Sequence, residues 1–531
     1  MKVLVSDSLS IEGLELLKAH TEVDYKPDMQ PGELVMEIGA YDALVVRSRS
    51  KVTAAVIEAG SNLKVIGRAG VGVDNIDVDK ATEKGIIVVN APHGNTISAA
   101  EHAIALLTSL ARNIAEANSS VKRGEWKRTQ YTGVELTNKV LGVVGVGRIG
   151  SEVARRARAM SMTIIAYDPY ISTEQAEKMN LELVTLEDLL KRADFITLHL
   201  PLGSSTHHLI GKKEIAMLKP GVRIINCARG GLIDEEALYN ALQEGRVAGA
   251  ALDVFEEEPP LNCRLLELDN VIVTPHLGAL TLEAQTNVAL QVSEQVIKAL
   301  QGEPIVSAVN VPSLMPEARA ALEPFLPLMR LMGSFYLQIF GGQVDEIELT
   351  YSGEIASMPL APLTISCLIG FLRHIIGDGV NWVNAPYIAK TRGINVREIS
   401  TTEIKNYSNL VTMTARSGSN EHHISGTLLN NDMRIVRVDD YRIEIVPSEF
   451  MLVTTHHDCP GVVGKIGTLL GDEKVNIASM QLGRKTAGGE AMMVLQVDDQ
   501  MSADVVNKVK KLDIIATARL VIIQKSVFKV N

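Results

Sequence analysis

The chain has 531 residues, of which 46% are hydrophobic and only 4% aromatic, and its formal net charge is −11. That length allows three or four domains of the usual ~100–200 residues with aliphatic cores, and the acidic balance argues against a nucleic-acid partner or an anionic membrane surface. Four cysteines are scattered without C-x-x-C spacing, which is typical of a reducing compartment and gives no sign of a metal site.

The N-terminal stretch MKVLVSDSLS enters an expected strand at once and lacks the apolar core of a signal peptide, so we expect a cytoplasmic protein. The most apolar run, Leu360–Ile376, carries Pro362 near its start and Arg373 and His374 near its end. It is also shorter than the roughly 20 residues that a membrane span needs, so we expect a buried helix and no membrane contact.

The first part of the chain alternates short β-branched runs with helical patterns, which predicts a parallel α/β domain over residues 1–97. Strands are expected at Lys2–Ser6, Ala43–Arg47, Lys64–Gly67 and Ile86–Asn90, and helices at Ser10–Ala19 and Ala54–Ala59. Apolar residues at helical spacing then predict one long helix over Ala99–Asn118 that leads out of this domain.

The stretch 139–150, KVLGVVGVGRIG, predicts a strand, a tight turn and the start of a helix. A short apolar run precedes Gly145, Gly147 and Gly150, which follow in the order G-x-G-x-x-G. In a dinucleotide site the first glycine allows the turn, the second lets the backbone approach a pyrophosphate, and the third lets helix and strand pack closely. The free N–H groups of the helix N-terminus favour a phosphate there.

The next expected strand, Thr163–Tyr167, ends in Asp168, about twenty residues beyond the glycines, where a ribose-binding carboxylate belongs. Further strands are expected at Phe195–Leu198, Arg223–Cys227, Ala250–Val254 and Val271–Thr274. Together they predict a doubly wound nucleotide domain over residues 98–282. A helix in 283–303, ending at Gly302, is expected to return to the first domain, so that the nucleotide domain is an insertion.

Two further domains are expected beyond Gly302. Prolines mark a linker, and alternating strands predict an α+β domain over residues 304–446. The expected strands are Val344–Ser352, Arg434–Val438 and Tyr441–Val446. Residues 447–531 follow the order βαββαβ, which is the ferredoxin-like plan.

Three loops at expected strand ends of the nucleotide domain hold reactive residues. They are NCARGGLIDEEAL with Arg229, DVFEEEPP with Glu256, Glu257 and Glu258, and VTPHLGA with His276. Reversible oxidation of a 2-hydroxy acid requires an arginine for the carboxylate, a histidine for the hydroxyl proton and a carboxylate to stabilise the imidazolium. Each residue alone also fits a surface salt bridge or a helix cap, but together they favour this chemistry.

A basic cluster lies in the first domain. Arg47, Arg49 and Lys51 fall in VVRSRSKV just after an expected strand, and Arg68 lies in GRAGVG. Such a group in an acidic protein suits a phosphate, and a solvated loop is the alternative.

The motifs GRAGVGVDNID, LGVVGVGRIGSEVARRA, INCARGGLIDEEAL, ALDVFEEEPP and TPHLGA resemble the D-2-hydroxyacid dehydrogenase family, and the added domains resemble those of its long-form D-3-phosphoglycerate dehydrogenases. The resemblance implies a Rossmann-type domain inserted in a flavodoxin-like substrate domain, NAD as cofactor, and a homo-oligomer, dimer or tetramer. It implies oxidation of 3-phospho-D-glycerate to 3-phosphohydroxypyruvate, the first step of L-serine biosynthesis. The alternatives are another D-2-hydroxy acid as substrate, or an NAD-sensing corepressor that shares the core.

The resemblance also implies roles for single residues. It implies catalytic roles for Arg229, Glu258 and His276. The implied cofactor residues are Gly145, Gly147, Arg148, Ile149, Gly150, Asp168, Cys227, Ala228, Arg229, Asp253, His276 and Gly278. The implied substrate residues are Arg47, Ser48, Arg49, Arg68, Gly70 and Arg128, the last from a basic position that the family contributes across a dimer interface. The expected caps or core histidines are His102, His199, His207 and His208.

The segment HHDCPGVVGKIGTLLGDEKVNIASM resembles an ACT domain, a module that binds small amino acids at a paired-domain interface. The resemblance implies L-serine as effector, held by Asp458 and Asn476, with Gly461 exposing the N–H groups of a helix N-terminus. A domain that serves only for dimerisation is the alternative. The histidine that some relatives use corresponds to either His456 or His457.

Overall fold

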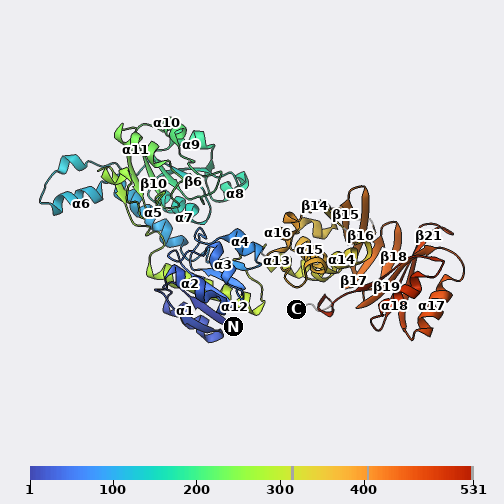
Figure 1. Ribbon diagram of the computed structural model, residues 1–531. Helices are drawn as coiled ribbons and strands as arrows, with labels where there is room; N and C mark the ends of the chain where they lie inside the picture. The colour runs from blue at the N-terminus through green and yellow to red at the C-terminus, as the bar shows by residue number, and fades with distance from the viewer. Residues whose placement is uncertain (313–315, 342, 404–405, 528–531) are drawn as a thin grey trace.

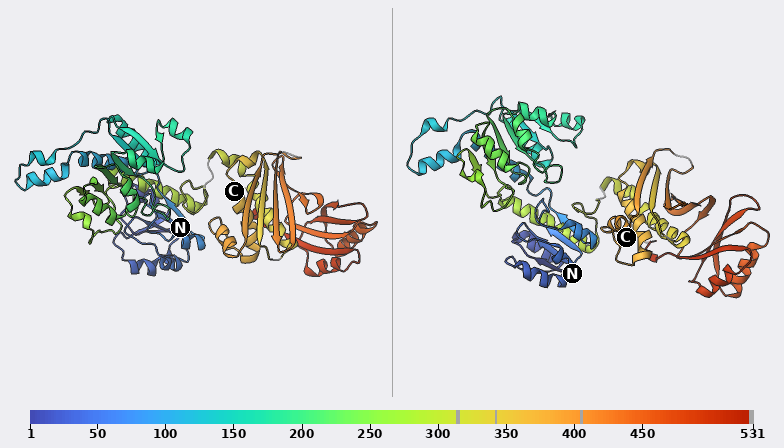
Figure 2. Two further views of the ribbon diagram at one scale, coloured as in Figure 1. Left: turned by 90° about the horizontal axis from the view of Figure 1, so that it is seen from above. Right: turned by 45° about the horizontal axis from the view of Figure 1, so that its top comes forward.

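The computed structural model describes residues 1–312, 316–341, 343–403 and 406–527, and its strands form four sheets (Figure 1). The first two sheets lie in the half of the molecule coloured blue to green, and the last two lie in the half coloured yellow to red. The rotated views show the same two halves (Figure 2). Within the described ranges, no helix is long and apolar enough to cross a membrane.

The first sheet is parallel, with the strand order β2-β1-β3-β4-β5 of a flavodoxin-like fold. Its strands are β1 (Lys2–Val5), β2 (Glu22–Tyr25), β3 (Ala43–Val46), β4 (Val65–Arg68) and β5 (Ile87–Asn90). Its helices are α1 (Ile11–His20), α2 (Pro31–Glu37), the 3-10 turn η1 (Ile38–Ala40), α3 (Ala54–Ala59) and α4 (Val78–Glu83). The alternation of apolar runs and helices therefore predicted this fold correctly, although β2, α2 and α4 were not expected.

The chain leaves this sheet through α5 (Thr96–Ala111) and then forms α6 (Ile114–Lys122) and the turn η2 (Arg128–Tyr131). The expectation of one helix over Ala99–Asn118 was wrong, because Asn113 adopts a left-handed conformation with φ 54° and separates α5 from α6. Helix α5 packs on the second sheet, whereas α6 projects from the body in every view (Figures 1 and 2).

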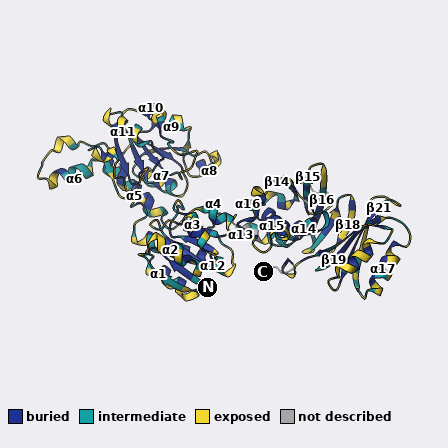
Figure 3. Ribbon diagram, viewed as in Figure 1, coloured by how far each residue is buried: buried dark blue, intermediate teal, exposed yellow. Residues whose placement is uncertain are grey.

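The second sheet is parallel and has the order β12-β11-β10-β9-β6-β7-β8. From β6 the chain adds β7 and β8 on one side of the sheet and then β9, β10, β11 and β12 on the other side. The position between β6 and β9 is therefore the topological switch point of a Rossmann fold. Buried apolar clusters cover both faces, as the dark blue strands in Figure 3 show. The elements are β6 (Val140–Val144), α7 (Arg148–Ala159), β7 (Thr163–Tyr167), α8 (Thr173–Lys178), β8 (Glu182–Leu183), α9 (Leu186–Arg192), β9 (Phe195–Leu198), α10 (Lys212–Met217), β10 (Val222–Asn226), α11 (Glu235–Gln243), β11 (Val247–Leu252), η3 (Arg264–Glu267) and β12 (Val271–Val273).

Helix α12 (Leu282–Gln301) carries the chain back to the first sheet and ends at Gly302, whose φ is 73°. The hydroxyl of Ser293 on α12 donates to the carbonyl of Gly13 on α1 at 3.0 Å. A Cβ at Gly67 on β4 would lie 2.6 Å from Val296, so only glycine allows this approach of helix to sheet. The two lobes are therefore joined by two crossings of the chain, α5 outward and the segment before α12 inward.

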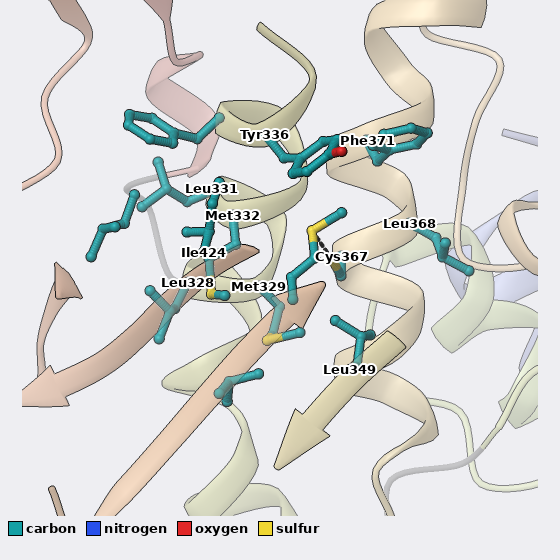
Figure 4. Close-up of a cluster of buried hydrophobic side chains, with 14 of the residues drawn as sticks. Leu328, Met329, Leu331, Met332, Tyr336, Leu349, Cys367, Leu368, Phe371 and Ile424 are labelled. Carbon is teal, nitrogen blue, oxygen red and sulfur yellow. Dashed lines mark hydrogen bonds between the residues drawn. The ribbon is translucent and has the colours of Figure 1, made fainter. Parts of the chain in front are cut away.

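The third sheet has the order β14-β13-β15-β16-β17-β18 and is covered by α14 and α15. These two helices touch at glycines, since a Cβ at Gly333 would lie 2.1 Å from the carbonyl oxygen of Cys367. Leu328, Met332 and Phe371 belong to the apolar cluster between helices and sheet (Figure 4). The elements are α13 (Pro316–Leu322), α14 (Phe325–Phe340), β13 (Glu346–Gly353), η4 (Glu354–Ser357), α15 (Ala361–Ile376), α16 (Ala385–Thr391), β14 (Asn395–Thr401), β15 (Asn409–Ser417), β16 (Asn420–Leu429), β17 (Asp432–Val438) and β18 (Tyr441–Ile445).

The fourth sheet is antiparallel, with the order β20-β21-β19-β22 and the βαββαβ connection that the sequence predicted. Helices α17 and α18 cover one face. The other face, which includes Met451 and Val494, belongs to the same apolar cluster as α14. The elements are β19 (Phe450–His457), α17 (Val462–Asp472), β20 (Ile477–Arg484), β21 (Glu490–Val497), α18 (Ala503–Lys510), β22 (Ile515–Ile522) and η5 (Lys525–Val527).

Candidate active site

A cavity of about 690 Å³ lies between the first and second sheets, at the carboxyl ends of their strands. Residues of both lobes line it, as expected for a crevice beside a topological switch point. Of the residues named from the sequence, it brings together Arg47, Ser48, Arg49, Arg68, Gly70, Arg148, Ile149, Cys227, Ala228, Arg229, Asp253, Glu258, His276 and Gly278. Within the described ranges, no group of three or more side chains that could hold a metal ion comes together.

His276 and Glu258 form a pair at the edge of this cavity. Nδ1 of His276 lies 2.8 Å from Oε2 of Glu258, and the N–H of Phe255 donates to Oε1 of Glu258 at 3.2 Å. Because the carboxylate accepts, Nδ1 carries the hydrogen and Nε2 of the neutral ring keeps its lone pair. The hydrogen bond from His276 to Glu258 raises the pKa of the histidine, and its burial acts in the opposite direction. Burial raises the pKa of Glu258, but the bond and the charge of His276 hold it below its usual value.

Asp253 organises the backbone around His276. Its carboxylate is 1% exposed and accepts the N–H groups of Leu277 at 2.7 Å and Gly278 at 2.8 Å, while its carbonyl accepts the N–H of His276 at 2.9 Å. His276 itself has a positive φ of 56°, which is uncommon for a residue with a Cβ and is frequent at functional sites. The loop that carries the histidine is thus held by one buried carboxylate.

Arg47, Arg68 and Arg229 lie close together on the side of the cavity that faces the substrate lobe. Burial and the charges of Arg229 and Arg47 lower the pKa of Arg68 to about 10. Nε of Arg68 is buried and has no hydrogen-bond partner among the described residues. The side chain folds over Gly70, where a Cβ would overlap its Nη1. A partly buried cation beside two others favours an anionic ligand.

Arg229 reaches across the cavity to the other lobe. Its Nε donates to Oδ2 of Asp74 at 3.2 Å, and its Nη1 donates to the carbonyl of Ala228 at 2.7 Å. A Cβ at Gly72 would lie 2.0 Å from Nη2, so glycine leaves the space that the guanidinium occupies. The contact with Asp74 was not expected from the sequence, because the two residues lie far apart along the chain.

Asp7 is a second residue that the sequence did not single out. It is 3% exposed and accepts the N–H groups of Arg47 at 2.5 Å and Ser50 at 3.2 Å. Its other oxygen accepts the hydroxyl of Ser50 and Nε of Arg49 at 3.2 Å. The guanidinium of Arg49 also donates to the carbonyls of Ser6 and Pro27. Asp7 therefore fixes the basic loop, and much of the hydrogen-bonding capacity of Arg49 is used within the lobe.

The glycine loop has the shape that a dinucleotide requires. A Cβ at Gly145 would lie 2.7 Å from the carbonyl of His199, and one at Gly150 would lie 2.0 Å from the carbonyl of Gly145. At Gly147, by contrast, no atom lies within 4 Å of the Cβ position, so the backbone at the start of α7 is open to a ligand. Asp168, at the end of β7, accepts the N–H of Val146 at 3.0 Å, so the loop and the carboxylate adjoin each other.

Arg128, Asp458 and Asn476 lie outside this cavity. Arg128 is exposed on the projecting segment that carries α6, and it does not line the cavity. In the fourth sheet, Asp458 accepts the N–H of Gly488 at 3.0 Å and Nη1 of Arg484 at 3.3 Å, whereas Asn476 donates to Asp498 at 2.6 Å. Asp458 and Asn476 therefore each have a partner of their own, and no direct bond joins them.

The chain matches three family models in succession. They are the NAD-binding domain of D-isomer specific 2-hydroxyacid dehydrogenase over residues 104–278, the D-3-phosphoglycerate dehydrogenase intervening domain over 321–439, and the ACT domain over 450–513. Among solved structures it is similar to a glyoxylate reductase from Paecilomyes thermophila, at 34% identity and a TM-score of 0.54, with 58% of this chain and 98% of that chain covered. It is also similar to the D-lactate dehydrogenase of Escherichia coli, at 28% identity and a TM-score of 0.52, with 58% and 100% covered.

Curated relatives extend the similarity over the whole chain. It is 48% identical to the D-3-phosphoglycerate dehydrogenase of Synechocystis sp., with 96% of this chain and 93% of the relative covered. It is 49% identical to the D-3-phosphoglycerate dehydrogenase of Methanocaldococcus jannaschii, with 96% and 98% covered. With a Rossmann-type domain that binds NAD, the intervening domain and an ACT domain, the chain belongs to the D-3-phosphoglycerate dehydrogenase family of NAD-dependent oxidoreductases.

Proposed function

We propose that the chain oxidises 3-phospho-D-glycerate to 3-phosphohydroxypyruvate with NAD, as the first step of L-serine synthesis. The observation that carries this proposal is the group of Arg47, Arg68 and Arg229 at one cavity, with Arg68 partly buried and repelled by the other two. A substrate with a carboxylate and a phosphate supplies the negative charge that this group lacks. Curated relatives with the same domains are named D-3-phosphoglycerate dehydrogenases.

The two anionic ends of the substrate would be bound by different lobes. Arg229 follows β10 beside the catalytic pair, so we assign it to the carboxylate next to the reacting carbon. Arg47 follows β3 and Arg68 is the last residue of β4, so we assign them to the phosphate, with Ser48 and Gly70 beside them. Arg49 contributes mainly by bracing the loop through Asp7. Closing the lobes on one substrate would then orient its hydroxyl toward His276.

His276 would act as the base. Nε2 accepts the proton of the substrate hydroxyl while the Nδ1–H bond to Glu258 holds the ring and stabilises its charged form. When bound, NAD accepts the hydride from the carbinol carbon. The site fits this cofactor, because Gly147 is open at the N-terminus of α7 and Asp168 lies beside the loop for the adenosine ribose. We assign Cys227, Ala228, Asp253 and Gly278 to the nicotinamide end.

The deciding experiment measures NAD reduction over a panel of hydroxy acids with the wild-type chain and the Arg68→Ala variant. We expect phosphoglycerate to be preferred over glycerate and other 2-hydroxy acids. Loss of a charged hydrogen bond should raise KM for phosphoglycerate about 10- to 100-fold and leave KM for glycerate nearly unchanged. Lys84→Ala, an exposed cation at the end of α4, is the control. Equal effects on both substrates would contradict the phosphate assignment, and no turnover at all would favour a corepressor-like role.

We further propose a homodimer or homotetramer in the cytoplasm. The projecting segment around α6 exposes Ile114, Val121 and Trp126, the last at 79% exposure, which is unusual for a surface that meets only water. Arg128 on this segment would reach the phosphate end of the partner's cavity. Trp126→Asp should therefore shift the sedimentation coefficient to that of a smaller species and raise KM for phosphoglycerate. An unchanged sedimentation coefficient would contradict this interface.

The proposed cytoplasmic location agrees with the four cysteines, which are free as in a reducing compartment.

We propose that L-serine binds the ACT domain near Asp458, Asn476 and the helix start at Gly461. The open N-terminus of α17 and an adjacent carboxylate match the carboxylate and ammonium of an amino acid. Because Asp458 is held by Arg484, binding requires that this ion pair rearranges.

We also propose that the chain divides into domains at residues 1–97 with 283–303, 98–282, 304–446 and 447–531.

A further inference from the structure

The two chain crossings between the catalytic lobes are tied together beside the nicotinamide end of the cavity. His102 lies on the outward crossing, α5, and its Nε2 is 3.2 Å from Oδ1 of Asp253 and 3.2 Å from the hydroxyl oxygen of Thr274 on the inward crossing. One turn earlier on α5, the hydroxyl of Ser98 lies 2.7 Å from that of Thr281, the N-cap of α12. His102 is thus more than a core or cap residue.

The hydrogens of this cluster can be assigned from its chemistry. The hydroxyl of Thr274 donates to Oδ1 of Asp253 at 2.5 Å, so its oxygen is an acceptor toward His102. Both neighbours of the ring nitrogen are therefore acceptors, and Nε2 of His102 must carry a hydrogen. His102 is a donor on α5 that satisfies the buried carboxylate of Asp253, which follows β11 in the second sheet.

The carboxylate of Asp253 depends on its donors because it is buried. Burial raises its pKa, and the bonds from His102, Thr274 and the backbone of 277–278 hold that pKa below the usual value for aspartate. Removing one donor from a buried charge is costly and allows the group to shift toward water. Such a shift would also displace the N–H groups of Leu277 and Gly278, which follow His276 directly.

On the basis of the proposed function, we infer that His102 is a positioning residue, which holds Asp253 and the backbone after His276 against the nicotinamide ring. It does so from the helix that carries the chain out of the substrate lobe. Asp253 is the group that contacts the cofactor, and His102 acts through it.

The test compares the binding of NADH with that of ADP-ribose, which lacks the nicotinamide ring. We expect His102→Leu to raise the Kd of NADH about tenfold, as for the loss of one charge-assisted bond, and to leave the Kd of ADP-ribose within about twofold. The value of kcat should fall by a similar factor. His102→Gln, whose amide can donate from the same direction, should recover most of both losses. Ser98→Ala, which removes the other bond between the crossings, should leave the ratio of the two Kd values unchanged.

Equal weakening of NADH and ADP-ribose would overturn the inference, because a general disturbance of the nucleotide lobe acts on both. Unchanged NADH binding and kcat in His102→Leu would overturn it as well. Failure of glutamine to recover the loss would also overturn it, because the shape of the ring and not its donor would then be responsible. These binding measurements need no substrate, so they remain informative even if phosphoglycerate proves not to be the substrate.

Discussion

The histidine of the site is half exposed and yet has a defined hydrogen-bond partner, which makes its contribution measurable. His276→Ala should lower kcat by about 10²–10⁴, because only the proton transfer is lost. The Kd of NAD, from fluorescence titration, should stay nearly unchanged. His20→Ala, an exposed histidine on α1, is the control. A normal rate in the His276 variant would remove the catalytic assignment.

The partner of that histidine should set the pH dependence. Glu258 raises the pKa of His276, and oxidation needs the neutral ring, so the rate should rise with pH as it passes through that raised value. Glu258→Gln removes the charge, which lowers the histidine pKa and moves the limb of the kcat/KM profile to lower pH. Reduction of the keto acid needs the protonated ring, so its rate should fall as pH rises through the same raised pKa. A limb that does not move would contradict the pairing.

Asp168 should decide between the two nicotinamide cofactors. Its carboxylate is tied to the glycine loop by the N–H of Val146 and to its own turn by the N–H of Tyr170 at 2.9 Å. A 2′-phosphate would meet this negative charge, so kcat/KM should be larger with NAD than with NADP. A preference for NADP in steady-state assays would mean that Asp168 is wrongly placed.

The residues that could be predicted from the sequence are those in the loops that follow buried strands. Arg229, Glu258 and His276 sit in loops after buried runs, and parallel strands end at one edge, so their meeting at one cavity was foreseeable. Asp7 and His102 could not be found in this way, because their partners lie far away in the chain and come close only in the folded structure.

At the level of elements, Gly150 and Gly147 in the turn between β6 and α7 are required for different reasons. Gly150 allows close packing, and Gly147 leaves room for a ligand. Gly150→Ala places a methyl group against the carbonyl of Gly145, so it should lower the melting temperature and NAD affinity together. Gly147→Val meets no protein atom near its Cβ, so it should fold normally and still weaken NAD binding at least tenfold by obstructing the pyrophosphate. Calorimetric melting with NAD titration distinguishes them. A destabilised Gly147 variant with normal NAD affinity would contradict this division.

Many elements with an apolar period were predicted, but the apolar helix α14 and the alternating strand β15 were missed, as were elements defined by tertiary contacts. The helical pattern continues past Ala111, so the break at Asn113 could not be read from periodicity. Strand β14 is largely exposed and carries Arg397 and Glu398, so it has no apolar alternation to reveal it. It exists because its backbone pairs with β13.

For the whole molecule, the regulatory prediction concerns communication between the two halves. L-Serine should lower kcat or change cooperativity without competing with phosphoglycerate, because its proposed site lies outside the catalytic cavity. Asp458→Ala and Asn476→Ala should abolish this inhibition, and Lys510→Ala on the exposed face of α18 is the control. Isothermal titration that shows no serine binding to the intact chain would leave only the dimerisation role.

The apolar underside of the fourth sheet bears on how such proteins can be divided and recombined. Gln338 of α14 bonds both polar backbone groups of Ile522, and Met451, Val453 and Met492 share the core of the third sheet. A fragment of residues 447–531 should therefore aggregate or lack near-UV circular dichroism, whereas one of residues 316–531 should be monodisperse on gel filtration. A chimera that exchanges regulatory domains between relatives would therefore have to carry the intervening and ACT domains together, because the two share one core.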